Sequence, residues 1–348
     1  MLEFNKVELQ KLSVNYVGNK SRDEMLQCSE YTAKLDDTLN IILLKYFLSS
    51  FDNQAEFYNL HHESDLKLNE IYTYVGELFE NPENFYKQNV NISRHLYEHS
   101  THPKIKAGEF YVVYFKECVV DGKTTDAIGL FKSENKDTFL KVQQTKDNFE
   151  INFEDGININ KLDKGCLIFN TEKENGYLVS IVDNVGKGSE AQYWKDDFLH
   201  LKARNDNYHN TKNILTLCKN FVVKKLPNEF DVSKADQADL LNKSVKYFKQ
   251  NESFGIDGFT KEVIGDPDVI KSFNNYRQQY SEEHDVQLIT DFDISAQAVK
   301  RQQRVFKSVI KLDKNFHIYV HGNHKLIEKG FDEATGMNFY KVFFKEEN

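Results

Sequence analysis

Three histidines in the N-terminal half have the spacing of metal ligands. His95, His99 and His102 stand at positions i, i+4 and i+7, which places side chains on one face of a helix, where imidazoles could bind a metal ion. Pro103 follows directly and disfavours helical backbone before it, so we expect His102 to lie beyond the helix end. The simpler interpretation is a partly exposed, histidine-rich helix end, and metal binding at His95 and His99 stays open.

A pair of aspartates near the C-terminus has the chemistry of a magnesium site. Asp291 and Asp293 supply carboxylates, the ligands that hard cations prefer, and a metal-dependent enzyme acting on nucleic acid would use such a pair. Aspartates ahead of a helix also cap its N-terminus. Capping is the simpler interpretation, with Asp293 or Ser295 as the cap of a short helix that reaches Arg301.

The sequence lacks the motifs of nucleophilic catalysis and of phosphate transfer. There is no G-x-S-x-G, and Gly255 and Gly258 flank a turn without the G-x-x-x-x-G-K-[ST] spacing of a phosphate loop. The four cysteines form no C-x-x-C pair, so we expect reduced thiols and no zinc site. We predict a non-enzymatic protein without catalytic residues, metal or cofactor, and infer no small-molecule substrate.

The densest cationic segment lies close to the C-terminus. Between positions 300 and 314 there are six basic residues and one acid, Asp313, with apolar residues interleaved. Basic side chains held outward by apolar anchors suit a surface that follows a phosphate backbone, although such a run can also be a plain solvated exterior. We predict DNA-phosphate contacts by Lys300, Arg301, Arg304, Lys307, Lys311 and Lys314, with Lys212 and Lys219 of an upstream helix as further candidates.

The net charge of −9 is unevenly distributed along the 348 residues. Residues 206–348 contain 21 basic and 21 acidic residues, so the 24 basic and 33 acidic residues before them carry the whole net charge. Because negative charge repels DNA at long range, binding needs a local basic face, which we expect in the C-terminal part. The alternative is a protein–protein interaction module or self-associating scaffold with an acidic N-terminal domain.

The first part of the chain combines helical and strand patterns. Alternation over residues 7–16 slips once, which predicts an edge or bulged strand. Helices are expected at 39–47, 67–80 and 83–99. From Phe110 the period becomes that of short strands, with a hairpin turn at Asp121–Gly122. The order predicts an acidic α+β domain, residues 1–205, of helices and a mostly antiparallel sheet.

The second part begins after a stretch with little regular pattern, residues 184–207, where we place a domain boundary. Helices are then expected at 213–223, 233–249, 258–264 and 266–280. The final segment alternates in short runs separated by turns, which predicts a small antiparallel β-meander. Residues 206–348 therefore form a second α+β domain, neutral overall, with a local basic segment.

Neither a membrane segment nor a signal peptide is expected. No apolar run approaches the roughly 18 residues that span a bilayer, and the first residues lack the basic-then-apolar layout of a secretory leader. The sequence therefore predicts a cytoplasmic protein.

Three segments, taken in order, resemble the bacterial NdpA/YejK-type nucleoid-associated protein family. Phe4 to Leu12 is similar to the family's opening, and Tyr208 with the helix at 213–223 is similar to its central helix. The segments 309–313 and 332–336 are similar to its closing β region. The resemblance covers nearly the whole chain, and none of its motifs is catalytic.

This resemblance implies a nucleoid-associated protein of the bacterial cytoplasm. Such a protein binds double-stranded DNA without catalytic chemistry, and we expect weak sequence specificity. Self-association into a homo-oligomer is a further expectation. The family supplies no motif-defined binding residues, so the candidate phosphate contacts depend on charge placement alone.

Overall fold

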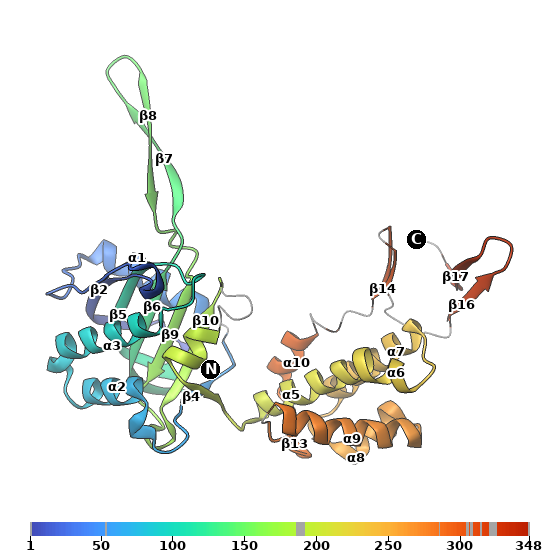
Figure 1. Cartoon of the computed structure of the whole chain (residues 1–348). Helices are drawn as coiled ribbons and strands as arrows, with labels where there is room; N and C mark the ends of the chain where they lie inside the picture. The colour runs from blue at the N-terminus through green and yellow to red at the C-terminus, as the bar shows by residue number, and fades with distance from the viewer. Residues whose placement is uncertain are drawn as a thin grey trace. The chain divides into compact units, whose positions relative to one another are not determined.

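The computed structural model describes residues 2–52, 54–185, 192–284, 286–303, 306, 309–313, 315–319 and 326–346. Contacts divide the chain into two compact units, Met1–Arg204 (unit 1) and Asn205–Asn348 (unit 2). Figure 1 shows unit 1 from blue to yellow-green and unit 2 from yellow to red. That each unit folds independently, as the predicted domains would, stays a prediction.

Unit 1 is built around a nine-stranded antiparallel sheet. Its order is β11-β4-β10-β9-β6-β5-β2-β3, with β1 also paired to β5. The strands are β1 (Leu2–Glu3), β2 (Glu8–Val17), β3 (Leu26–Gln27), β4 (Tyr58–Leu60), β5 (Gly108–Val120), β6 (Lys123–Ser133), β9 (Lys164–Phe169), β10 (Leu178–Asp183) and β11 (Leu201–Ala203).

Two local features of this sheet follow directly from the sequence. The β5–β6 hairpin turns at Asp121 and Gly122, which both have positive φ, as a type I′ turn requires. The pairing of β2 with β5 shifts register between Leu9 and Lys11, which is the predicted bulge. Both expectations are confirmed.

Helices cover both faces of the sheet. Successive side chains of a strand point to opposite sides, so alternate residues of β5 belong to two separate cores. The first core contains side chains of α2 (Glu70–Glu80) and α3 (Phe85–His99), and the second contains those of α1 (Asp37–Leu48). Asp36 and Asn69 cap α1 and α2 by accepting from backbone N–H groups. The α+β class is thereby confirmed.

The stretch that the sequence leaves irregular contains a buried turn of π-helix, η6 (Tyr193–Phe198). Trp194 and Phe198 are fully buried in the first core, with ring centroids 5.0 Å apart. The following strand, β11, pairs with β4 at the edge of the sheet. The sequence pattern does not indicate this turn, because six residues are too few to show a periodicity.

Two lysines are buried inside unit 1. Lys132 Nζ lies 3.1 Å from Glu134 Oε1, and Lys164 Nζ lies 2.7 Å from Asp183 Oδ2. The Tyr193 hydroxyl donates to Glu134 Oε1 at 2.8 Å. Burial lowers the pKa of Lys132, and the neighbouring Glu134 counteracts this shift. The cluster borders a cavity of about 130 Å³, but its charges are paired, as buried charges must be.

A two-stranded ribbon in unit 1 pairs with no strand of the sheet. Its strands are β7 (Asp137–Gln144) and β8 (Phe149–Gly156), drawn in green in Figure 1. Nearly all its residues are exposed. The sequence predicts the two strands but gives no sign that they leave the sheet.

Unit 2 is mainly helical. Its elements are α5 (Asn207–Asn220), η7 (Phe221–Lys225), α6 (Leu226–Glu229), α7 (Lys234–Gln250), β12 (Ser253–Gly255), α8 (Ile256–Phe259), η8 (Thr260–Ile264), α9 (Pro267–Glu283), β13 (Asp291–Asp293) and α10 (Ala296–Gln302). One apolar core joins α5, α7, α9 and α10. Among its aromatic residues, Phe248 and Phe292 each stack on Phe254. None of the helices in the described ranges has the length and apolar character needed to cross a bilayer.

The C-terminal β region takes the form of two consecutive hairpins. The first pairs β14 (Val309–Leu312) with β15 (Phe316–Tyr319), and the second pairs β16 (Ile327–Asp332) with β17 (Met337–Val342). Both contribute to a small cluster with Ala235 and Ala238 of α7. The predicted antiparallel β ending of the chain is therefore present.

Candidate nucleic-acid interface

Helix α5 carries two of the predicted cations on one side. Lys212 and Lys219 are seven residues apart, which is close to two full helical turns, so both project from the same side of the helix about 10 Å apart. Ile214, Leu217 and Cys218 are buried in the unit 2 core. Both lysines are partly buried, as expected when the aliphatic stem lies on protein and the charged head reaches solvent.

Helix α10 brings two more predicted cations to the first turns of α5. Its cap residue Ser295 donates its backbone N–H to Thr211 Oγ1 at 3.0 Å. Lys300 and Arg301 are exposed at its other end. Arg301 Nη1 lies 3.4 Å from the Tyr208 hydroxyl, to which it donates. Since Tyr208 precedes Lys212 by one helical turn, α10 and α5 gather their cations in one region.

The acid at the start of this region has a structural role. Asp206 caps α5, since its carboxylate accepts from the backbone N–H of His209 at 2.9 Å and lies 3.0 Å from the ring Nδ1 of the same residue. From position 207 to 228 the chain then contains no acidic residue. This stretch of chain therefore carries lysines, among them Lys212, Lys219 and Lys224, and no acidic residue of its own.

The other four predicted contacts lie between positions 304 and 314. Arg304, Lys307 and Lys314 lie outside the described residues. Lys311 belongs to β14, where its backbone is paired opposite His317. Phosphate contacts by these four residues stay predictions.

Three further lysines on α7 escaped the sequence-based prediction. Lys243, Lys246 and Lys249 are exposed at three-residue spacing, and Lys243 forms an ion pair with Asp239 at 2.9 Å. No acidic residue occurs from position 240 to 251. The opposite side of α7 is buried in the same core as α5. The sequence signal that could have identified these lysines is the lack of acidic residues around them, not the density of the lysines.

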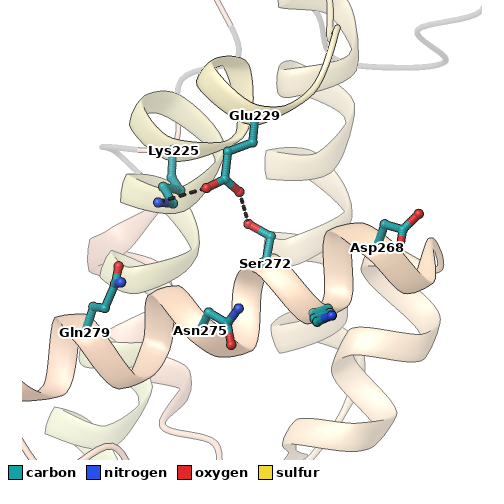
Figure 2. A pocket seen from close by; sticks show the side chains of 7 residues that line it. Lys225, Glu229, Asp268, Ser272, Asn275 and Gln279 are labelled. Carbon is teal, nitrogen blue, oxygen red and sulfur yellow. Dashed lines mark hydrogen bonds and ion pairs between the residues drawn. The ribbon is translucent and has the colours of Figure 1, made fainter.

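A polar groove in unit 2 lacks the arrangement of a catalytic site. It has a volume of about 290 Å³ and lies between η7, α6 and α9; Figure 2 shows Glu229 between Lys225 and Ser272. Lys225 Nζ is 2.8 Å from Glu229 Oε1, and the Ser272 hydroxyl donates to the same carboxylate. These hydrogen bonds lower the pKa of Glu229. A carboxyl group with a lowered pKa is ionised near neutral pH and is a weak base, so Glu229 is poorly suited to donate a proton or to activate the serine.

The candidate metal ligands form no metal centre within the described ranges, where no group of three or more His, Cys, Asp or Glu side chains is placed to hold an ion. His99 ends α3, so His102 lies beyond the helix, as predicted. Asp291 and Asp293 do not cap α10, whereas Ser295, the other predicted cap, does. Pairing of β13 with β12 holds them in extended backbone, and Ser295 supplies the cap by accepting from the Ala298 N–H.

His95 is expected to make unit 1 less stable in acid. Its Nε2 donates to the Phe198 carbonyl at 3.0 Å, and burial, with the nearby His99, lowers the pKa of His95. The unfolded chain binds this proton near pH 6.5, whereas the folded chain binds it only at lower pH. The contribution of His95 to the free energy of unfolding is therefore complete above about pH 6.5. It decreases as the pH drops below that value.

The substitution His95→Gln tests this directly, because the glutamine amide keeps a donor for the carbonyl but does not titrate. Thermal unfolding of the full chain between about pH 8 and pH 5 should show a smaller acid-induced loss of Tm in the variant than in the wild type. Parallel Tm curves for the two proteins would contradict this account of His95.

Comparison with known protein families identifies one match over most of the chain. The family model described as nucleoid-associated protein YejK matches residues 14–335, which include most of the unit 1 sheet and the helices and first hairpin of unit 2. No curated protein matches the chain. The match confirms the resemblance stated from the sequence. This chain belongs to the family of nucleoid-associated protein YejK.

Proposed function

We propose that this protein binds double-stranded DNA at the bacterial nucleoid, without catalysis, through the basic side of unit 2. The observation that carries the proposal is the pair of packed helices, α5 with η7 and the second half of α7, that expose lysines over two stretches without any acidic residue. Arg301 and Lys300 of α10 extend this surface. Membership of a nucleoid-associated family supports the same conclusion.

Phosphates, rather than base edges, are the expected contacts. Lysine carries a compact charge on a flexible stem, which suits the phosphate backbone, whereas base readout relies on fixed bidentate groups. In the described part of this surface the cations are lysines except for Arg301. The acidic residues of unit 1 repel the same backbone. Binding should therefore depend strongly on salt and only weakly on sequence.

The experiment is fluorescence anisotropy with the full chain and two labelled duplexes of equal length, one rich in A·T and one rich in G·C. At about 50 mM salt both should bind, with Kd values within roughly threefold of each other, because counterion release is independent of sequence. A preference of about 100-fold or more for one duplex would show that contacts to the bases determine the affinity. An absence of binding at micromolar protein would overturn the proposal.

A further inference from the structure

The two faces of the β7–β8 ribbon differ sharply in chemistry. Residues directly opposite in the pairing share a face, and faces alternate along each strand. The pairs on one face are Leu140 with Phe153, Val142 with Ile151, and Gln144 with Phe149. The pairs on the other are Phe139 with Glu154, Lys141 with Asn152, and Gln143 with Glu150. One face is thus almost wholly apolar, and the other is mostly polar and charged.

The apolar face is open to solvent. Its five large side chains, Leu140, Val142, Phe149, Ile151 and Phe153, are each between 61% and 75% exposed. At roughly 150–200 Å² for each complete side chain, the face exposes on the order of 600 Å² of apolar surface, at the upper end of the largest patch on a typical monomer. A two-stranded ribbon is only marginally stable alone in water, so this face calls for a cover.

We infer that the cover is the same face of a second copy of this chain, and that the two ribbons pack together around a two-fold axis. Two such faces together bury on the order of 1,200 Å², the lower bound for a stable protein–protein interface. A two-fold contact uses one patch twice and so requires a self-complementary patch. An apolar face meets that requirement, because apolar side chains pack equally well against a copy of the same face.

Antiparallel packing of the two ribbons also places the polar ends favourably. Asp155 and Thr138 lie on the apolar face at the base of the ribbon, hydrogen-bonded to each other at 2.7 Å. Gln144 lies on the same face next to the tip, where the connecting turn carries Lys146 and Asp147. With the tip of one ribbon over the base of the other, Asp155 lies opposite the tip of the partner's ribbon and far from the partner's own Asp155, so no pair of like charges is buried.

Charge excludes DNA as the cover. Residues 137–156 contain two basic and five acidic residues, and a phosphate backbone is repelled by such a segment. The ribbon and the proposed DNA surface therefore serve different partners. The inference about the ribbon does not depend on the proposed function.

The test measures the mass of the full chain in solution by sedimentation equilibrium from roughly 1 to 100 µM, a range that covers micromolar dissociation constants. The wild type should reach the mass of two chains. Leu140→Ser/Ile151→Ser, on the apolar face, should have the mass of one chain. Lys141→Ser/Glu150→Ser, at matched positions on the other face, should remain at two. The inference would be overturned if the wild type had the mass of one chain or if the apolar-face variant had the mass of two. It would also be overturned if the control variant had the mass of one chain.

A crosslinking variant covers the case in which the serine variant fails to fold. Val142→Cys lies near the middle of the apolar face, and Lys141→Cys lies beside it on the other face. A short bis-maleimide should join two chains of Val142→Cys at least tenfold more efficiently than two chains of Lys141→Cys. The wild type supplies the background from Cys28, the native cysteine that is not buried. Equal yields from the two variants would overturn the inference.

Discussion

Replacing Glu134 with alanine is expected to destabilise unit 1 by about 3–5 kcal/mol. Lys132 is fully buried with its ammonium 3.1 Å from the Glu134 carboxylate. Removing the carboxylate leaves a buried positive charge without its counterion, although one backbone carbonyl still accepts from Lys132 at 2.7 Å. The measurement is urea unfolding of the full chain, monitored at the fluorescence of Trp194, the one tryptophan of the chain.

The matched control removes both charges. The double substitution Lys132→Met/Glu134→Leu should lie within about 1 kcal/mol of the wild type, because a buried ion pair gives little net stability over apolar residues of similar size. A Glu134→Ala protein within about 1 kcal/mol of the wild type would show that solvent reaches Lys132. A double variant as unstable as Glu134→Ala would show that the pair itself is needed.

Neutralising four cations of the proposed DNA surface, two on α5 and two on α10, is expected to weaken DNA binding at least 100-fold. The variant combines Lys212→Gln, Lys219→Gln, Lys300→Gln and Arg301→Gln. Each lost phosphate contact removes about one released counterion, which is worth roughly tenfold in affinity at about 50 mM salt. Even two true contacts among the four therefore give the expected loss.

The control for this variant removes the same number of charges from lysines that do not belong to the proposed surface. It carries glutamine at four exposed lysines of unit 1: Lys34, Lys67, Lys123 and Lys146. Its affinity for the same duplex should stay within about threefold of the wild type, because none of these four lysines is a proposed phosphate contact. If the two variants lose equal affinity, only the net charge matters and the surface is wrongly placed.

Local features of the fold could be predicted because the physics that sets them is local. An aspartate before an apolar stripe starts α1, Asp121–Gly122 turns the β5–β6 hairpin, and a slipped alternation gives the bulge in β2. Each depends on neighbouring residues only. The order of the nine strands depends on pairings between distant segments, which no local pattern specifies.

Charged residues misled the sequence interpretation for a physical reason. Lysines are almost always exposed, so nothing local marks Lys132 as buried, and its partner network includes Tyr193, 61 residues away. The approach of Arg301 to Tyr208 joins residues 93 positions apart. Sequence patterns identified cations that α5 and α10 bring together, but missed the lysines of α7, since their signal is a lack of acids.

The central claim is that unit 2 binds DNA through phosphate contacts, and the salt dependence of binding tests it most directly. The observed binding constant of the wild type and of the four-glutamine unit 2 variant is measured from about 50 to 200 mM salt. The wild-type plot of log K against log salt concentration should have a slope of about −4 or steeper. The slope of the variant should be smaller in magnitude by about 2 to 4, because each lost phosphate contact removes about 0.9 from it. A wild-type slope near zero, or an unchanged slope in the variant, would contradict the claim.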